Sequence, residues 1–224
     1  MRSPFPSTVA AVLVLTSGTA PGQEAGGGDG CEERLGALAL MQTLNARILS
    51  SRSATASLEA WCAARGLASE PKVTARLVKG AAKAPTREQL DRLQVDDAQA
   101  LRYRHVRLAC GDHVLSEADN WYVPSRLTHE MNQLLETTDT PFGRAVQPLE
   151  PYRQTFAVTV LWQPMPEGWE RRPLDGLCDV ATTPLALPEH LFEHRAVLYT
   201  SDGRPFSEVS ERYTREVLAP PGGN

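Results

Sequence analysis

Residues 101–123 read LRYRHVRLACGDHVLSEADNWYV, and this stretch decides the fold. Two extended runs, 101–110 and 113–123, flank Gly111-Asp112, a pair of residues suited to the tight turn of a β-hairpin. Successive side chains of a strand point to opposite faces, so each run can be divided into two faces by alternation. The stretch therefore predicts two antiparallel strands and tells which of their side chains share a face.

The segments around this hairpin predict more strands and several helices. Further strands are expected at residues 72–79, 156–162, 196–199 and 206–217, the last two around the turn Ser201-Asp202-Gly203. Helices are expected at residues 32–49, 57–64, 86–93 and 126–135, the last with Ser125 as its cap. Helices come first and strands dominate afterwards. The sequence therefore predicts an α+β fold, with a mainly antiparallel single sheet and helices packed on one face.

The N-terminus has the layout of a signal peptide. Arg2 precedes a short apolar run, Val9 to Leu15, which is followed by the small residues of Ala20-Pro21-Gly22. We expect residues 1–22 to be removed and the protein to be secreted or periplasmic; the alternative is a disordered extension. The rest divides into a flexible leader (23–30), a single domain (31–218) and a disordered tail (219–224).

Composition excludes several classes of protein. The 224 residues are 42% hydrophobic and 22% charged, as in a foldable globular chain. A net charge of −4 offers no basic surface for a phosphate backbone, so no nucleic-acid partner is expected. The N-terminal apolar run of about seven residues is far shorter than the roughly 20 that a membrane span needs. We expect no membrane span, and a monomer.

Four cysteines, Cys31, Cys62, Cys110 and Cys178, are spread over the domain. In an oxidising compartment an even number permits two disulfides, with three connectivities left open. Buried thiols are the alternative. No two cysteines form a C-x-x-C pair, so the sequence does not support a zinc or thioredoxin-type site.

Two charged residues fall on faces that are otherwise apolar. Arg104 alternates in phase with Val106 and Leu108, and Glu211 alternates in phase with Val209. A buried charge costs several kcal/mol unless it is paired or meets a ligand. Either the two residues form a structural salt bridge, or Arg104 grips a substrate carboxylate while Glu211 hydrogen-bonds the other end of the ligand.

Several motifs in sequence order resemble the chorismate pyruvate-lyase family. They are the hairpin at 103–108 leading to Tyr122-Val123-Pro124, the turn Thr140-Pro141-Phe142-Gly143-Arg144, Gly203-Arg204-Pro205 leading to Glu211-Arg212-Tyr213, and Ser53-Ala54-Thr55 after the first helix. The resemblance covers roughly residues 38–217. It implies a chorismate lyase-like fold, a single sheet with helices on one face and a small internal cavity closed by flaps.

The resemblance also implies an activity and a site. Arg104 would bind the ring carboxylate of chorismate or 4-hydroxybenzoate and Glu211 would meet the ring hydroxyl, with Ala54, Phe142 and Gly143 as further substrate contacts. Pyruvate would be eliminated from chorismate, giving 4-hydroxybenzoate, with no cofactor. One extra residue before Glu211 leaves Glu208 and Ser210 as alternative equivalents of the family's carboxylate. The second functional hypothesis is an exported, non-catalytic protein that binds small aromatic or cyclic carboxylic acids.

A weaker signal is His190-Leu191-Phe192-Glu193-His194, which has the order of a zinc-binding helix. The predicted helix is short, from Pro188 to about Arg195, and few residues follow it to supply a third ligand. We interpret these as ordinary surface residues on a two-turn helix, and expect no metal.

Overall fold

A computed structural model describes residues 29–80, 82–173 and 184–221 of the chain. The expected signal peptide, residues 1–22, lies outside the described residues, and so do Cys178 and the last part of the expected tail, residues 222–224. The first helix starts at Asp29, so the last two residues of the expected leader belong to that helix.

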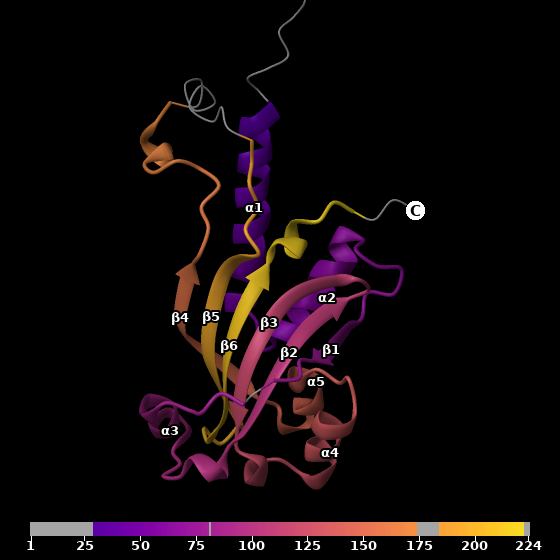
Figure 1. Cartoon of the computed structure of the whole chain (residues 1–224), viewed down its shortest axis with the longest axis vertical. Coiled ribbons are helices and arrows are strands. Elements are labelled where there is room, and N and C mark those ends of the chain that lie inside the picture. The colour runs from indigo at the N-terminus through magenta and orange to yellow at the C-terminus, as the bar shows by residue number, and fades with distance from the viewer. Residues whose placement is uncertain (1–28, 81, 174–183, 222–224) are drawn as a thin grey trace, which may run out of the picture.

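A single six-stranded antiparallel sheet forms the centre of the fold (Figure 1), with the strand order β1-β2-β3-β6-β5-β4. The strands are β1 (Val73–Leu77), β2 (Arg102–Cys110), β3 (His113–Tyr122), β4 (Tyr152–Val160), β5 (His190–Tyr199) and β6 (Pro205–Thr214). At the turn between β2 and β3, Gly111 adopts a φ of 57°, a backbone conformation that favours glycine. The predicted α+β class with a mainly antiparallel sheet is confirmed.

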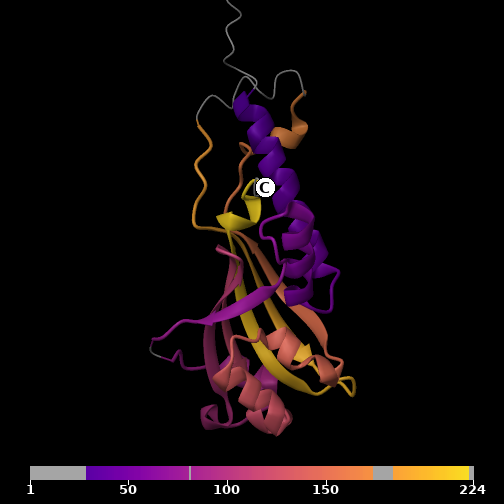
Figure 2. The same cartoon turned by 90° about the vertical axis from the view of Figure 1, so that its right-hand side faces the viewer.

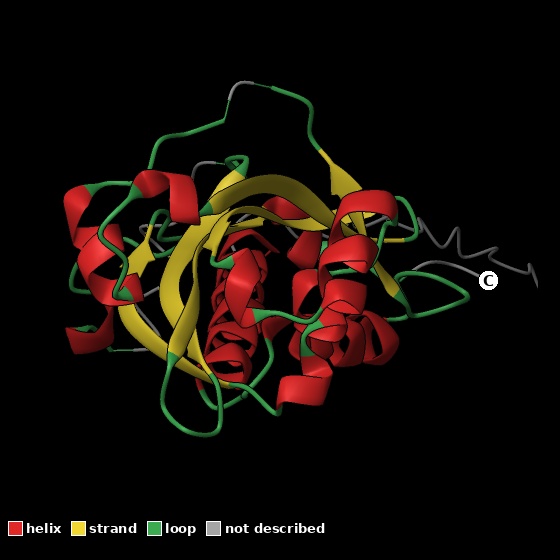
Figure 3. Cartoon of the chain, turned by 90° about the horizontal axis from the view of Figure 1, so that it is seen from below, coloured by secondary structure: helices red, strands yellow, loops and turns green. Residues whose placement is uncertain are grey.

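The sheet curves strongly, and most helices lie inside its curve (Figures 2 and 3). The helices are α1 (Asp29–Leu49), α2 (Ala54–Arg65), α3 (Arg87–Leu93), α4 (His129–Thr137) and α5 (Phe142–Ala145). The main core lies between the sheet and α1 and α2, where Met41, Leu44 and Leu58 are fully or almost fully buried. None of the described helices combines the length and the apolar character needed to cross a bilayer.

Helix α3 differs from the prediction of helices on one face only. Thr86 and Gln89 form a reciprocal capping box at its start. Its buried Leu93 packs against Trp121 and Val197 in a second, smaller apolar cluster. Trp121 neighbours the inward-facing Asn120 along β3, so it points to the opposite face of the sheet. The α3 region therefore covers part of the outer face.

The segment that contains the predicted helix Pro188 to Arg195 is a strand instead. Strand β5 runs from His190 to Tyr199 and pairs with β4 on one side and β6 on the other. Its backbone groups are thus hydrogen-bonded across both neighbours, and this tertiary pairing outweighs the local helical pattern.

A smaller correction concerns the helix expected at residues 126–135. The structure begins α4 at His129, where the Oγ1 of Thr128 accepts a hydrogen bond from the Met131 amide at 3.3 Å. The expected cap, Ser125, lies in a short 3-10 turn instead. Both Ser and Thr are good caps, so the sequence signal alone did not distinguish the two starts.

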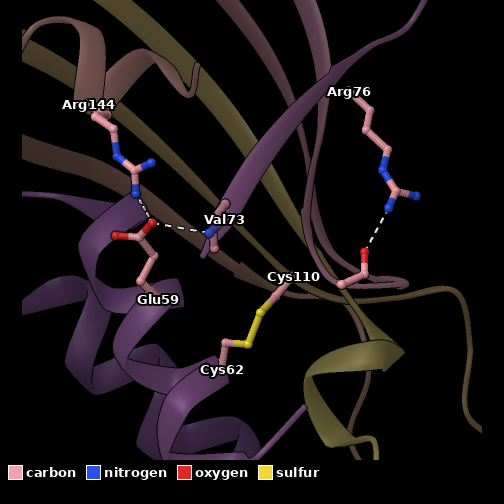
Figure 4. Close-up of a disulfide and its surroundings, with 7 residues drawn as sticks. Glu59, Cys62, Val73, Arg76, Cys110 and Arg144 are labelled. Carbon is pink, nitrogen blue, oxygen red and sulfur yellow. Dashed lines mark hydrogen bonds and ion pairs between the residues drawn. A yellow bond between two sulfur atoms is a disulfide. The ribbon is translucent and has the colours of Figure 1, made fainter. Parts of the chain in front are cut away.

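A disulfide joins α2 to the end of β2 (Figure 4). It links Cys62 to Cys110, both fully buried, and Cys31 is disulfide-bonded as well. Beside it, Glu59 of α2 accepts hydrogen bonds from the backbone N–H of Val73, at 3.1 Å, and from Arg144. These contacts hold α2 against β1, β2 and α5, and the start of α2 forms one wall of the site described below.

Replacing both Cys62 and Cys110 with alanine should lower the free energy of unfolding by about 2–4 kcal/mol, because the crosslink restricts the unfolded chain over a sequence separation of 48 residues. Urea denaturation of the purified protein measures the loss. Dithiothreitol should lower the stability of the parent protein and have a smaller effect on the variant. A parent protein that is insensitive to the reductant would contradict the prediction.

Candidate functional site

A cavity of about 60 Å³ lies inside the curve of the sheet, between the strands and the starts of α2 and α5. It is small compared with the roughly 300–1,000 Å³ typical of ligand pockets. Its polar and charged lining comes from Arg52, Ser53, Thr55, Arg104, Asn120, Arg153, Ser207 and Glu211. The remaining lining residues are Ala54, Val106, Leu108, Ala118, Phe142, Gly143, Pro151, Leu198 and Val209. A small, mostly apolar space with several convergent polar groups is the usual form of a small-molecule site.

Arg104 is a buried cation at one end of this cavity. The residue is only 5% exposed, and its Nη1 and Nη2 atoms each donate to the carbonyl oxygen of Thr140 at 3.3 Å. Its Nε has no hydrogen-bond partner, and no ion pair with an acid is found for it in the described part of the chain. Burial lowers the pKa of the guanidinium from its usual value because desolvation disfavours the charged form. Arg104 is therefore poised to accept an anion.

Glu211 also lines the cavity, but its partner is not Arg104. Oε2 of Glu211 lies 2.8 Å from Nη2 of Arg153, and it accepts a hydrogen bond from the hydroxyl of Tyr213 at 3.1 Å. The side chains of Glu211 and Arg153 are 7% and 3% exposed. The alternative hypothesis of a salt bridge between Arg104 and Glu211 is wrong, and Arg104 keeps its charge free for a ligand.

Arg153 is the main residue of the site that the sequence reasoning missed. It lies on β4, three residues before Phe156, the first apolar residue of the stretch from which that strand was predicted. A register shift between Thr155 and Ala157 interrupts the alternation along this strand. Counting back across this shift from Val158 and Val160 therefore does not give the face on which Arg153 lies.

Glu208 and Ser210, the alternative equivalents of Glu211, lie on the outer face of the sheet. The Nε and Nη2 atoms of Arg92 donate to the two carboxylate oxygens of Glu208 at 2.7 and 2.9 Å. Ser210 donates to Glu193 at 2.8 Å. Neither residue lines the cavity, so Glu211 is the inward carboxylate of β6.

The three remaining residues of the predicted site line the cavity at the starts of two helices. Ala54 begins α2, and Phe142 begins α5 with its ring centroid 5.4 Å from that of Tyr122. Gly143 allows the two helices to meet, because a Cβ there would lie 2.9 Å from Oγ1 of Thr55. All five predicted contacts thus surround one space.

Asn120 and Ser207 form a buried polar pair that is not among the predicted site residues. The hydroxyl of Ser207 donates to the side-chain oxygen of Asn120 at 2.6 Å, and Asn120 lies directly opposite Arg104 in the pairing of β2 and β3. An Asn amide whose oxygen is occupied still offers its NH₂ donors. The pair therefore adds polar groups beside the Arg104 end of the cavity.

His194 is fully buried beneath the site, and not on the surface as predicted. Its Nε2 lies 2.7 Å from Oδ1 of Asn45, and its ring stands edge-on to Tyr213. Burial and, second, the positive charge of Arg153 lower its pKa to about 4, so the imidazole is neutral at pH 7. His190 instead contacts Glu117 on the outer face, so the two histidines of the H-x-x-E-H pattern do not converge.

The described residues contain one group of side chains whose atoms could surround a metal ion, Glu117, Glu189 and His190. Glu117 is already satisfied, because Nε of Arg107 donates to its Oε1 at 2.7 Å and His190 lies 3.1 Å from its Oε2. These contacts lower the pKa of Glu117 despite the opposing effect of its burial. None of the three residues lines the cavity, so this group is not part of the candidate site.

Protein stability should fall between pH 6.5 and pH 4 because of His194. The unfolded chain binds a proton near pH 6.5, whereas the folded chain keeps His194 neutral down to about pH 4, so stability is full above this window and declines through it. We expect His194 to contribute about 2–3 kcal/mol to this decline. Urea denaturation at several pH values measures it, with His194→Gln as the comparison. Parallel pH profiles for the two proteins would contradict this origin.

Comparisons with known proteins give one strong relative and several weak structural likenesses. The uncharacterized protein y4mC of Sinorhizobium fredii is 49% identical over 187 residues, which are 83% of this chain and 78% of that protein. No protein-family profile matches the chain, so the resemblance to chorismate pyruvate-lyases stays a prediction.

Three of the solved structures that align with the chain illustrate a low similarity. PhnF from Mycobacterium smegmatis aligns at 11% identity over 76% of this chain and 67% of its own, with a TM-score of 0.47. The effector domain of PhnF alone aligns at 12% identity over 73% of this chain and 89% of its own, with a TM-score of 0.45. A GntR-family transcriptional regulator from Enterococcus faecalis aligns at 10% identity over 65% of this chain and 96% of its own, with a TM-score of 0.41. Likenesses this weak say nothing about what the chain binds.

Proposed function

This chain belongs to the same protein family as y4mC of Sinorhizobium fredii, and we propose that it binds a small carboxylic acid in the cavity around Arg104. The observation that carries the proposal is that Arg104 is only 5% exposed and has no acidic partner among the described residues. Such a charge costs several kcal/mol to bury, and a ligand carboxylate recovers much of this cost.

The geometry of Arg104 suits a carboxylate better than a neutral group. A guanidinium presents parallel N–H donors that match the two oxygens of a carboxylate, and charge-assisted bonds of this kind are about twice as strong as neutral ones. The two Nη atoms make only long, 3.3 Å bonds to the carbonyl of Thr140, which a stronger acceptor can replace or share. The neighbouring Asn120 amide can donate to the same anion.

The remainder of the cavity favours a compact, cyclic body. Apolar walls are contributed by Val106, Leu108, Ala118, Phe142, Leu198 and Val209. Away from Arg104, the ion pair of Glu211 and Arg153 offers both an acceptor and donors to a polar substituent. A small aromatic or cyclic acid with one hydroxyl group matches these environments: its carboxylate suits Arg104, its ring suits the apolar walls, and its hydroxyl suits the ion pair.

A second candidate function is the elimination of pyruvate from chorismate, which gives 4-hydroxybenzoate. It is favoured by one observation, that Arg104 and Glu211, the two residues to which the chorismate pyruvate-lyase resemblance assigns roles, line the same cavity. In this reaction the ether C–O bond breaks, the ring loses a proton and becomes aromatic, and the departing enolpyruvyl group takes up a proton at its methylene carbon to give pyruvate. Positioning of the ring by Arg104 and of a polar substituent by Glu211 is what this chain would contribute.

We also propose that the protein acts outside the cytoplasm. The N-terminal signal-peptide pattern motivates this, and the Cys62–Cys110 disulfide supports it, because disulfides persist in oxidising compartments. Export favours the binding function over the lyase, since chorismate is made and used in the cytoplasm.

Isothermal titration of the purified protein with benzoate, 4-hydroxybenzoate and benzamide tests the proposal. Both acids should bind, and benzamide, which has the same shape but no charge, should bind at least about tenfold more weakly. Equal affinity for benzamide and benzoate would reject carboxylate recognition. Incubation with chorismate, monitored by the absorbance of 4-hydroxybenzoate, separates the two candidate functions. If the acids bind but no 4-hydroxybenzoate forms at high protein concentration, the lyase function is rejected and the binding function is kept.

A further inference from the structure

A second, larger cleft of about 640 Å³ lies directly outside the cavity. The two spaces share Arg52, Ser53, Thr55, Gly143 and Pro151 as lining residues, so the cleft meets the cavity at the start of α2. The inner space of about 60 Å³ is too small for a ligand of ordinary size, whereas the two spaces together lie in the usual range. A ligand whose carboxylate reaches Arg104 therefore has room to continue outward into the cleft.

Arg52 stands where the two spaces meet. It lines both of them, is exposed, and has no ion-pair partner in the part of the chain that the structure describes. The other cation of the cleft, Arg144, is already paired with Glu59. Arg52 is thus the cation of this cleft whose charge remains available to a ligand.

We propose that the outer cleft is a subsite for a second acidic group, and that Arg52 determines the preference for it. The preferred ligand is then an elongated diacid, with one carboxylate on Arg104 inside the sheet and its second acidic group beside Arg52. This inference rests on the proposed function, because it extends the ligand from the Arg104 end. Pro148 and Pro151 line the cleft and offer apolar surface to the part of the ligand between the two groups.

Glu150 is the feature of the cleft that opposes this assignment. It is exposed and lines the same space, and no ion pair with Arg52 is found among the described residues. A tail that carried a positive charge would meet Glu150 favourably and Arg52 unfavourably. The sign of the preferred tail therefore has to be tested directly with ligands of both charges.

Three benzoates with the same ring carboxylate and different tails at position 4 make this test. They are 4-methoxybenzoate (neutral tail), 4-(carboxymethoxy)benzoate (acidic tail) and 4-(2-aminoethoxy)benzoate (basic tail), titrated calorimetrically into the purified protein. The acidic tail should bind about three- to fivefold more tightly than the neutral one, a modest gain because Arg52 is exposed. Arg52→Gln should remove this difference, measured as the ratio of the affinities for the acidic and the neutral tail in each protein.

Two matched variants control for charge alone. Arg87→Gln removes an exposed arginine of α3, which pairs with Asp91 and lines neither space, and should leave the preference intact. Glu150→Gln should leave the preference for the acidic tail in place or strengthen it.

The remaining outcomes overturn either the subsite or the proposed function. Equal binding of the acidic and neutral tails, or tighter binding of the basic tail, overturns the subsite and leaves the proposed function standing. A loss of preference in Arg87→Gln equal to that in Arg52→Gln also overturns it. No binding of any of the three acids overturns the proposed function, and this inference falls with it.

Discussion

Replacing Arg104 with methionine removes carboxylate binding and, at the same time, raises the free energy of unfolding of the ligand-free protein. The loss of binding follows from the loss of about two charge-assisted hydrogen bonds, each contributing about 1.5–3 kcal/mol, so the dissociation constant should rise by roughly 10²- to 10⁴-fold. Titration with benzoate measures the change.

The gain in stability has a separate cause. Arg104 is buried, the pKa of its guanidinium is lowered by desolvation, and the described residues give it no acid to pair with. An apolar side chain of similar length avoids that cost, and we expect about 1–2 kcal/mol of added stability after the lost bonds to the Thr140 carbonyl are deducted. Urea denaturation without ligand measures it.

Arg104→Lys is the informative companion variant. Lysine keeps the charge but lacks the planar pair of donors, so affinity should fall by about tenfold or more without the gain in stability. If Arg104→Met left the affinity for benzoate unchanged, the anchor of the site would be wrongly assigned. If it destabilised the ligand-free protein by several kcal/mol, Arg104 would be a structural residue.

Breaking the buried ion pair of Arg153 and Glu211 should lower the free energy of unfolding by a large amount. Arg153→Met leaves a buried carboxylate without its cation, and Glu211→Met leaves a buried guanidinium without its anion. Each should cost about 3–5 kcal/mol of the free energy of unfolding. The double variant leaves no charge stranded, and its cost should be smaller than that of either single variant. Urea denaturation of the four proteins completes the cycle.

Glu208→Met provides the matched control on the same strand. Its partner Arg92 is 30% exposed and can return to water, so the cost should be smaller than at Glu211, and affinity for benzoate should not change because Glu208 faces away from the cavity. Additive costs in the Arg153 and Glu211 cycle would show that the two charges do not depend on each other. A loss of ligand affinity in Glu208→Met would contradict the assignment of faces.

The alternation of side chains along the strands predicted two of the charged residues of the site. It placed Arg104 and Glu211 on inward faces, and the structure has both side chains buried around one cavity. It failed for Arg153 because a register shift interrupts the period between that residue and the apolar stretch that revealed the strand. Asn120 and Ser207 were not assigned to the site, since a polar residue near the end of a strand is also explained by capping or packing.

The sequence alone determined most of the helices and strands, the main hairpin and the faces on which Arg104 and Glu211 lie, because these depend on neighbours within a few residues. Only the tertiary structure decided that residues 190–199 form a strand, since its hydrogen-bond partners come from β4 and β6. The same holds for the partner of Glu211. Strand order and sheet curvature bring Arg153 to that carboxylate and leave Arg104 unpaired, and no local pattern encodes which distant strand will lie alongside.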